Sequence, residues 1–328
     1  MVASPDGAPG TRPWPRPRVL VSECLGFAAV RYNGQILSNA FVAGLRAYAD
    51  LVPLCPEVAI GLGVPREPIR LVAREGAVRL VQPATGRDLT EPMIAFARDA
   101  VAALGPLDGA VLKSRSPTCG LKDVRVYPEV GPPPEGRKMG LFAAELVRAL
   151  PELVVEDDGR LTNAALRHHF LVRLFALADL RRVAASGSPA ELVAFHSRYK
   201  LLLMAVSPEA LRALGRRVAA TRRAHWEENV SAYRRLFAAT LARTPRRPGV
   251  VNALQHAFGY VSRRLTAGER TLFDELLAQY RGGRVRLEEL LTLLEGWAVR
   301  FDESYLLAQR LFHPYPRPLR VLTDSGRR

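Results

Sequence analysis

The sequence has few cysteines and no long apolar segment. All three of its cysteines lie within the first 119 of 328 residues, and this odd number does not build the paired disulfide framework of small secreted domains. No uncharged apolar run approaches the roughly 18 residues of a membrane-spanning helix. Residues 1–17 are rich in proline and glycine and lack the apolar centre of a signal peptide. We therefore expect a cytoplasmic protein without membrane contact, and a disordered leader at residues 1–17.

Positive charge is concentrated in one half of the chain. Residues 161–328 contain 28 Lys and Arg against 14 Asp and Glu, which accounts for +14 of the net charge of +15. Residues 1–160 contain 19 basic and 18 acidic residues. An arginine-rich composition alone would charge both halves, whereas a one-sided positive field attracts polyanions. The second half is therefore expected to bind nucleic acid.

The first half, residues 18–158, alternates short apolar runs with helical stretches. This pattern predicts an α/β domain with a mostly parallel sheet and flanking helices, a Rossmann-like arrangement. The segment Gly61-Leu62-Gly63 lacks the next glycine and the helix of a dinucleotide fingerprint, so no nucleotide cofactor is expected. The expected strands are residues 18–22, 51–55 and 108–113, with a possible edge strand at 80–83.

The second half, residues 159–328, is helical almost throughout. Ser188 and Ser207 are each followed by proline, an arrangement typical of a helix start. We expect an all-α domain here, with its boundary at the acidic turn that ends at residue 158.

The three cysteines lie at or just beyond the ends of predicted strands. Cys24 follows the first strand, Cys55 ends the second, and Cys119 lies in the segment after the third. Sites in open parallel sheets form beyond the carboxyl ends of the strands, so three loops can bring three thiolates together. Their neighbours are Gly, Pro, Ser and Glu, as expected for loop ligands. This pattern indicates a metal site.

The number of ligands bears on the kind of metal site. Structural zinc prefers four protein ligands, and no histidine near these cysteines completes the set. A cubane cluster held by three cysteines leaves one iron open to bind a soft atom such as sulfur. Two other interpretations stay open: a non-catalytic RNA-binding accessory protein with structural zinc, and a redox sensor.

Three strings carry a family resemblance. They are SECLGFAAVRYNG at 22–34, LCPEVAIGLGVPREPIRL at 54–71 and LKSRSPTCG at 112–120. With these strings the first half resembles the thiouracil desulfidase family. The second half resembles the YbgA-like helical domain, most clearly at FHSRYKLLLMAVSPEALRALGR, residues 195–216.

The resemblance implies a [4Fe-4S] cluster held by Cys24, Cys55 and Cys119, whose open iron binds the thiocarbonyl sulfur. Proteins that join these two domains resemble desulfidases that convert 4-thiouridine in tRNA to uridine, with hydrolytic release of sulfide and no net redox change. An alternative substrate is free thiouracil or a thionucleoside, with the helical half as a lid or dimer surface. The sequence departs from the family pattern at Glu23, where a small residue is commoner, and at Thr118, where serine is usual.

Hydrolysis needs a proton acceptor for water and a proton for the ring nitrogen. Glu57 is our candidate acid/base, although it could instead form an ion pair with Arg66. Ser116 could orient the water or serve as a turn hydroxyl, and Lys113 could stabilise developing charge. Arg31 and Arg66 could hold a phosphate or the pyrimidine carbonyl.

Candidate RNA-binding residues lie in the helical half. Arginines neutralise phosphates and aromatic side chains stack on bases, so paired arginines with Trp226, Tyr233 and Tyr260 between them suggest an RNA surface. Any single pair could also be a solvated helix face. The candidates are His196, Lys200, Arg216, Arg217, Arg222, Arg223, Arg234 and Arg235.

Overall fold

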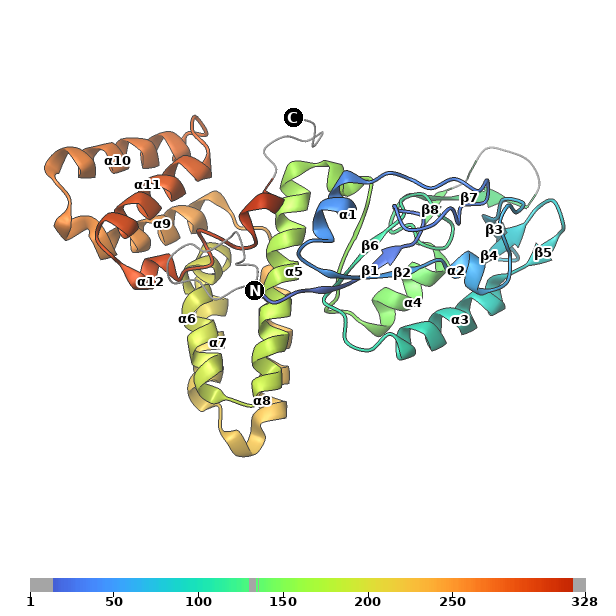
Figure 1. The fold of residues 1–328 in the computed structure, drawn as a ribbon, viewed down its shortest axis with the longest axis horizontal. Coiled ribbons are helices and arrows are strands. Elements are labelled where there is room, and N and C mark those ends of the chain that lie inside the picture. The colour runs from blue at the N-terminus through green and yellow to red at the C-terminus, as the bar shows by residue number, and fades with distance from the viewer. Residues whose placement is uncertain (1–13, 130–133, 135, 321–328) are drawn as a thin grey trace. The chain divides into compact units, whose positions relative to one another are not determined.

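The computed structural model describes residues 14–129, 134 and 136–320 (Figure 1). These residues form two compact units. The first unit comprises residues 16–174 and 318–320, and the second comprises residues 14–15 and 175–317. The division falls inside helix α5 (Ala164–Ser186), whereas the sequence analysis places the domain boundary before this helix, at residue 158.

The expected leader lies mostly outside the described residues, at positions 1–13. Its last residues, 14–17, are held by contacts. The Trp14 ring packs edge-on against Phe175, with 5.6 Å between the ring centroids, and the Arg310 guanidinium lies 3.5 Å from the Trp14 centroid. Arg16 pairs with Asp50 at 2.8 Å and donates to backbone carbonyls of the preceding turn. These contacts order a segment whose composition suggested disorder.

Sheet A of the first unit has four parallel strands in the order β2-β1-β6-β9. The two central strands have apolar centres and are almost fully buried, as expected when both faces of a parallel sheet are covered. The strands are β1 (Arg18–Ser22), β2 (Asp50–Leu54), β6 (Gly109–Leu112) and β9 (Val154–Asp157). With the helices around it, this sheet confirms the predicted α/β fold.

Four helices of the first unit precede α5 in the chain. Two of them, α3 and α4, pack against each other through Phe96 and Phe142, whose rings stack at 6.4 Å. Phe142 and Met93 are fully buried in the core beneath the sheets. The helices are α1 (Ala40–Leu45), α2 (Pro56–Ala59), α3 (Thr90–Ala103) and α4 (Leu141–Ala149).

The first unit also contains a second, mixed sheet that the sequence analysis did not predict. Sheet B has the order β5-β4-β3-β7-β8, in which only β3 and β7 are parallel. The run at 80–83 was expected at an edge, but its residues 80–82 belong to β4, which lies between β3 and β5. The strands are β3 (Arg70–Arg74), β4 (Ala77–Gln82), β5 (Arg87–Asp88), β7 (Val124–Pro128) and β8 (Gly136–Lys138).

The second unit is helical, as predicted. Ser188 and Ser207 cap α6 and α7 by accepting hydrogen bonds from the backbone N–H groups of Glu191 and Ala210. The helices after α5 are α6 (Pro189–Val206), α7 (Pro208–Ala220), α8 (Trp226–Leu241), α9 (Arg247–Val261), α10 (Ala267–Arg281), α11 (Leu287–Arg300) and α12 (Ser304–Leu307). Among the described residues, no helix is both long and apolar enough to cross a membrane.

Candidate active site

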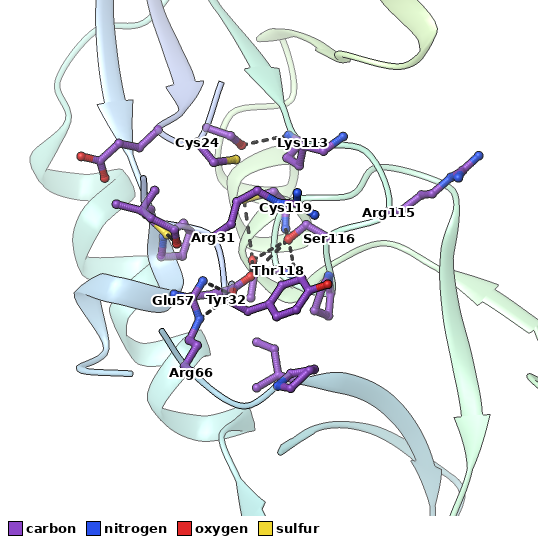
Figure 2. Close-up of a pocket in the computed structure, with 18 of the residues that line it drawn as sticks. Cys24, Arg31, Tyr32, Glu57, Arg66, Lys113, Arg115, Ser116, Thr118 and Cys119 are labelled. Atoms are coloured by element: carbon purple, nitrogen blue, oxygen red, sulfur yellow. Dashed lines mark hydrogen bonds and ion pairs between the residues drawn. The ribbon is translucent and has the colours of Figure 1, made fainter. Parts of the chain in front are cut away.

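The three cysteines surround one cavity of the first unit. Cys24 follows β1, Cys55 directly follows β2 and precedes α2, and Cys119 lies in the loop after β6. These strands are neighbours in sheet A, so their carboxyl ends meet at the same edge. All three cysteines line a cavity of about 610 Å³, which Figure 2 shows with Cys24 and Cys119 labelled. The structure therefore brings together the cysteines that the sequence analysis grouped.

The Cys119 thiol is buried, those of Cys24 and Cys55 are partly buried, and the three influence one another electrostatically. Burial raises the pKa of Cys24 to about 11 and that of Cys119 to about 12, and it also raises the pKa of Cys55. Cys55 further raises the pKa of Cys24, and Cys24 further raises that of Cys119. Among the described residues, no three His, Cys, Asp or Glu side chains form a group that could hold a metal ion. Because burial raises the pKa of all three thiols, three thiolates in this cavity would require a compensating positive charge.

Glu57 lies in the first turn of α2 and joins two parts of the site. Its Oε2 accepts from Arg66 Nη2 at 2.5 Å and from Nε at 3.1 Å. Its Oε1 accepts from Thr118 Oγ1 at 2.9 Å and from Ser116 Oγ at 3.3 Å. Arg66 is 4% exposed and Glu57 13%. The ion pair considered from the sequence is present, and the other carboxylate oxygen faces the loop that carries Cys119.

Ser116 shapes the turn that carries Cys119. Its Oγ accepts from the backbone N–H groups of Cys119 at 3.1 Å and Thr118 at 3.3 Å. The turn is packed tightly, because a Cβ on Gly120 would lie 2.9 Å from the Ser116 carbonyl oxygen and one on Gly140 only 2.5 Å from the Thr118 carbonyl. Ser116 thus has the turn role considered from the sequence while also contacting Glu57.

Lys113 is held by a carboxylate that the sequence analysis did not select. Its Nζ lies 2.9 Å from Asp158, which also accepts from the Ser114 N–H at 2.7 Å. Asp158 directly follows β9, the fourth parallel strand of sheet A, so it reaches the same edge as the cysteines. The signal in the sequence was the acidic turn at 156–158, which by itself indicated only a domain boundary.

The loop after Cys24 adds an aromatic side chain that the sequence analysis also missed. Tyr32 lines the cavity and is 43% exposed, and its carbonyl accepts from the Arg66 N–H at 2.8 Å. Figure 2 shows its ring among the side chains of the cavity. Arg31 also lines the cavity and donates to Gln35 at 3.1 Å. An exposed ring beside polar groups can stack on a flat heterocycle.

The basic candidates of the second unit lie on α6, α7, α8 and the segment between α7 and α8. His196 Nδ1 lies 3.0 Å from the Tyr233 hydroxyl, and burial and then Lys200 lower the pKa of His196. Arg234 is partly buried. The exposed candidates are Lys200, Arg216, Arg217, Arg222, Arg223 and Arg235.

The aromatic residues between the arginines do not form one stacking surface. Tyr233 is fully buried against Phe195 and Phe237, so the expectation that it lies on an RNA surface is wrong. Trp226 is partly buried and donates to the Ala184 carbonyl. Tyr260 is 44% exposed and stacks on Tyr305. The helical spacing of Tyr233 and Trp226 placed their rings in or against the core.

Comparison with known proteins identifies the first half of the chain. The model of the 2-thiouracil desulfurase family matches residues 19–158. An uncharacterized protein of Bacillus subtilis (strain 168), YbbK, is 32% identical over 109 residues, which make up 31% of this chain and 72% of that protein. The chain belongs to the 2-thiouracil desulfurase family. The segment that matches the family contains all three cysteines, Glu57 and Ser116, and it confirms the predicted resemblance.

The second half matches a different model, described as a protein of unknown function, DUF1722, at residues 200–316. The uncharacterized protein YbgA of Escherichia coli (strain K12) is 29% identical over 158 residues, 48% of this chain and 93% of that protein. This confirms the predicted YbgA-like region. A solved structure, the [4Fe-4S]-dependent thiouracil desulfidase TudS, is 29% identical and covers 44% of this chain and 93% of its own, with a TM-score of 0.36.

Proposed function

We propose that this desulfurase-family protein is a [4Fe-4S]-dependent desulfidase that acts in the cytoplasm and removes sulfur from 4-thiouridine in tRNA to give uridine. The observation that carries the proposal is the meeting of three thiols, one buried and two partly buried, and a carboxylate around one cavity. Family membership supports sulfur removal as the chemistry. The reaction exchanges the thiocarbonyl sulfur for a water oxygen and releases sulfide, so it needs no oxidant.

The donor set fits an iron–sulfur cluster, which is larger than the single metal ion for which the described residues form no group. Cys24, Cys55 and Cys119 supply three soft ligands from neighbouring loops, and the positive charge of iron would offset the burial that keeps their protons bound. These cysteines would hold the cluster. When bound, it supplies an iron without a protein ligand, a Lewis acid with affinity for sulfur.

Glu57 is the proposed acid/base. Two hydrogen bonds from Arg66 to Oε2 fix the carboxylate, which leaves Oε1 directed toward Ser116 and Thr118 on the cysteine loop. From this position Glu57 would accept a proton from the attacking water and pass it to the departing sulfide. Ser116 and Thr118 would orient the water, and Lys113, held by Asp158, would stabilise developing negative charge.

The tRNA part of the proposal rests on the second half of the chain. Its net charge of +14 and the exposed arginines of α7 and the α7–α8 segment suit contact with a phosphate backbone. His196, Lys200, Arg234 and Arg235 extend this set on α6 and α8. The second candidate function is desulfuration of free thiouracil or a thionucleoside, which a cavity of about 610 Å³ is large enough to hold.

The test is anaerobic purification followed by absorption spectroscopy and an assay of thionucleoside loss and sulfide release. A brown protein that acts on tRNA containing 4-thiouridine, and whose Cys24→Ala variant does not, would support the proposal. Action on free thiobases alone would favour the second candidate. A protein that stays colourless after reconstitution with iron and sulfide would overturn the cluster and favour a non-catalytic zinc or RNA-binding role.

A further inference from the structure

A second cavity adjoins the cysteine cavity within the first unit. Its volume is about 500 Å³, and it lies against sheet B. The two cavities share lining residues, namely Pro68, Ile69, Arg70, Arg115 and Pro117. Figure 2 shows the Arg115 side chain extending away from Cys24 and Cys119. The reaction site therefore continues into a neighbouring space that its chemistry does not use.

Three strands of sheet B place an arginine each on the lining of this second cavity. Arg125 on β7 pairs directly with Arg137 on β8. Arg70 on β3 precedes the paired residues Leu71 and Val126 by one position, as Arg125 does on its own strand. Because side chains alternate along a strand and Leu71 is buried, Arg70, Arg125 and Arg137 share the opposite, exposed face. We call these three residues the arginine row.

The arginine row has no carboxylate partner among the described residues, unlike several other cations of this unit. Within the part of the chain that the structure describes, no carboxylate forms an ion pair with any of the three. Asp123 also lines the cavity, but its carboxylate is engaged by Arg115. It accepts a hydrogen bond from the Arg115 backbone N–H at 3.0 Å and lies 3.8 Å from the Arg115 Nε.

Neighbouring cations show the contrast. On the same sheet, Arg74 pairs with Glu129 at 3.0 Å. In the cysteine cavity, Arg66 pairs with Glu57 and Lys113 with Asp158. Like charges directly opposite each other across a ladder destabilise a sheet. A row of cations that repel one another at the wall of a cavity is therefore suited to hold an anion.

We propose that the arginine row binds the phosphate of a thiolated pyrimidine nucleotide, free or within RNA, while its base occupies the cysteine cavity. This inference rests on the proposed desulfidase function, and it places the phosphate one sugar away from the base. Arginine forks match phosphate oxygens in pairs. Arg70 is steadied for this by the Tyr127 ring, whose centroid lies 4.9 Å from its guanidinium carbon.

The first test measures binding without turnover. Anaerobically purified protein is titrated with uridine and with uridine 5′-monophosphate by calorimetry, as wild type and as the double variant Arg125→Gln/Arg137→Gln. We expect the phosphate to strengthen binding roughly tenfold or more in the wild type, and the double variant to lose most of this gain. Arg87→Gln, an exposed arginine of β5 that does not line the cavity, is the matched control and should keep the gain.

The second test compares kcat/KM for 4-thiouridine, its 5′-monophosphate and thiolated tRNA. A wild-type preference for the monophosphate that the double variant loses assigns the row to the nucleotide phosphate. A preference that appears only with tRNA and is lost in the variant assigns it to the RNA backbone. Equal binding of uridine and its monophosphate, together with no change in preference on substitution, would overturn the inference. A wild type that binds the monophosphate but desulfurates none of these substrates would instead contradict the proposed function.

Discussion

The two units use their positive charges differently. In the first unit, two cations beside the cysteines are tied to carboxylates, Arg66 to Glu57 and Lys113 to Asp158. In the second unit, Arg216, Arg217 and Arg223 are exposed, and no ion pair holds them among the described residues. A paired charge has a fixed orientation, which a reaction requires, whereas an exposed charge can adjust to a flexible polyanion. The comparison separates a reaction site from an attachment surface.

Removing one thiol should have the largest effect on the first unit. Cys119→Ala should lose visible absorbance and activity on every thiolated substrate, by at least about a hundredfold, because the loss of a direct ligand should cost no less than loss of an outer contact. Iron and sulfide content per chain and the absorption spectrum are the measurements. Full cluster content in this variant would contradict the proposed ligand set.

A smaller but still large effect is expected at Glu57. Glu57→Gln keeps the shape of the side chain but removes the proton acceptor, so kcat should fall roughly a hundredfold while cluster absorbance is retained. Glu67→Gln, an exposed glutamate of the same segment, is the matched control. If Glu57 acts only as the partner of Arg66, the variant should lose thermal stability with little change in kcat, so Tm is measured alongside.

The sequence was sufficient to predict the cysteine site but not everything around it. β1 and β6 have short apolar centres bounded by polar residues or turns, so their ends, and the cysteines beyond them, could be located. Sheet B was missed because its strands are short and alternate apolar residues with arginines. The pairing of β3 with β7 also joins segments that are distant in the chain.

The contacts of individual side chains also depended on segments that are distant in the chain. Thr118 was noted only as a departure from the family pattern, yet the structure shows it donating to Glu57. Asp158 was missed because its contact with Lys113 depends on the order of strands in sheet A. Tyr233 was placed on the surface by sequence, although its helix turns it into the core. The sequence shows residue types and the local hydrophobic periodicity, but it does not show contacts between distant segments.

The exposed arginines of the second unit should affect substrate preference rather than chemistry. Replacing Arg216, Arg217, Arg222 and Arg223 with glutamine should lower kcat/KM for thiolated tRNA relative to free 4-thiouracil by about tenfold or more. Each lost phosphate contact should also reduce the slope of log affinity against log salt by about one. Arg281→Gln, an exposed arginine on α10, serves as the control. An unchanged salt slope in the quadruple variant would place the RNA contacts elsewhere.

The smallest expected effect concerns the partly buried His196 on α6 and the pH dependence of the free energy of unfolding. Burial and Lys200 lower the pKa of His196 below 6.5, so the unfolded chain binds a proton there more readily than the folded chain. This group therefore makes the free energy of unfolding fall as the pH drops from about 6.5 toward the lower folded pKa, and adds no pH dependence above that range. Urea unfolding at pH 5.5 and 7.5 should show a smaller difference for His196→Gln than for the wild type. An equal difference in both proteins would mean that folding does not change the pKa of His196, which would contradict the effect of its partial burial beside Tyr233.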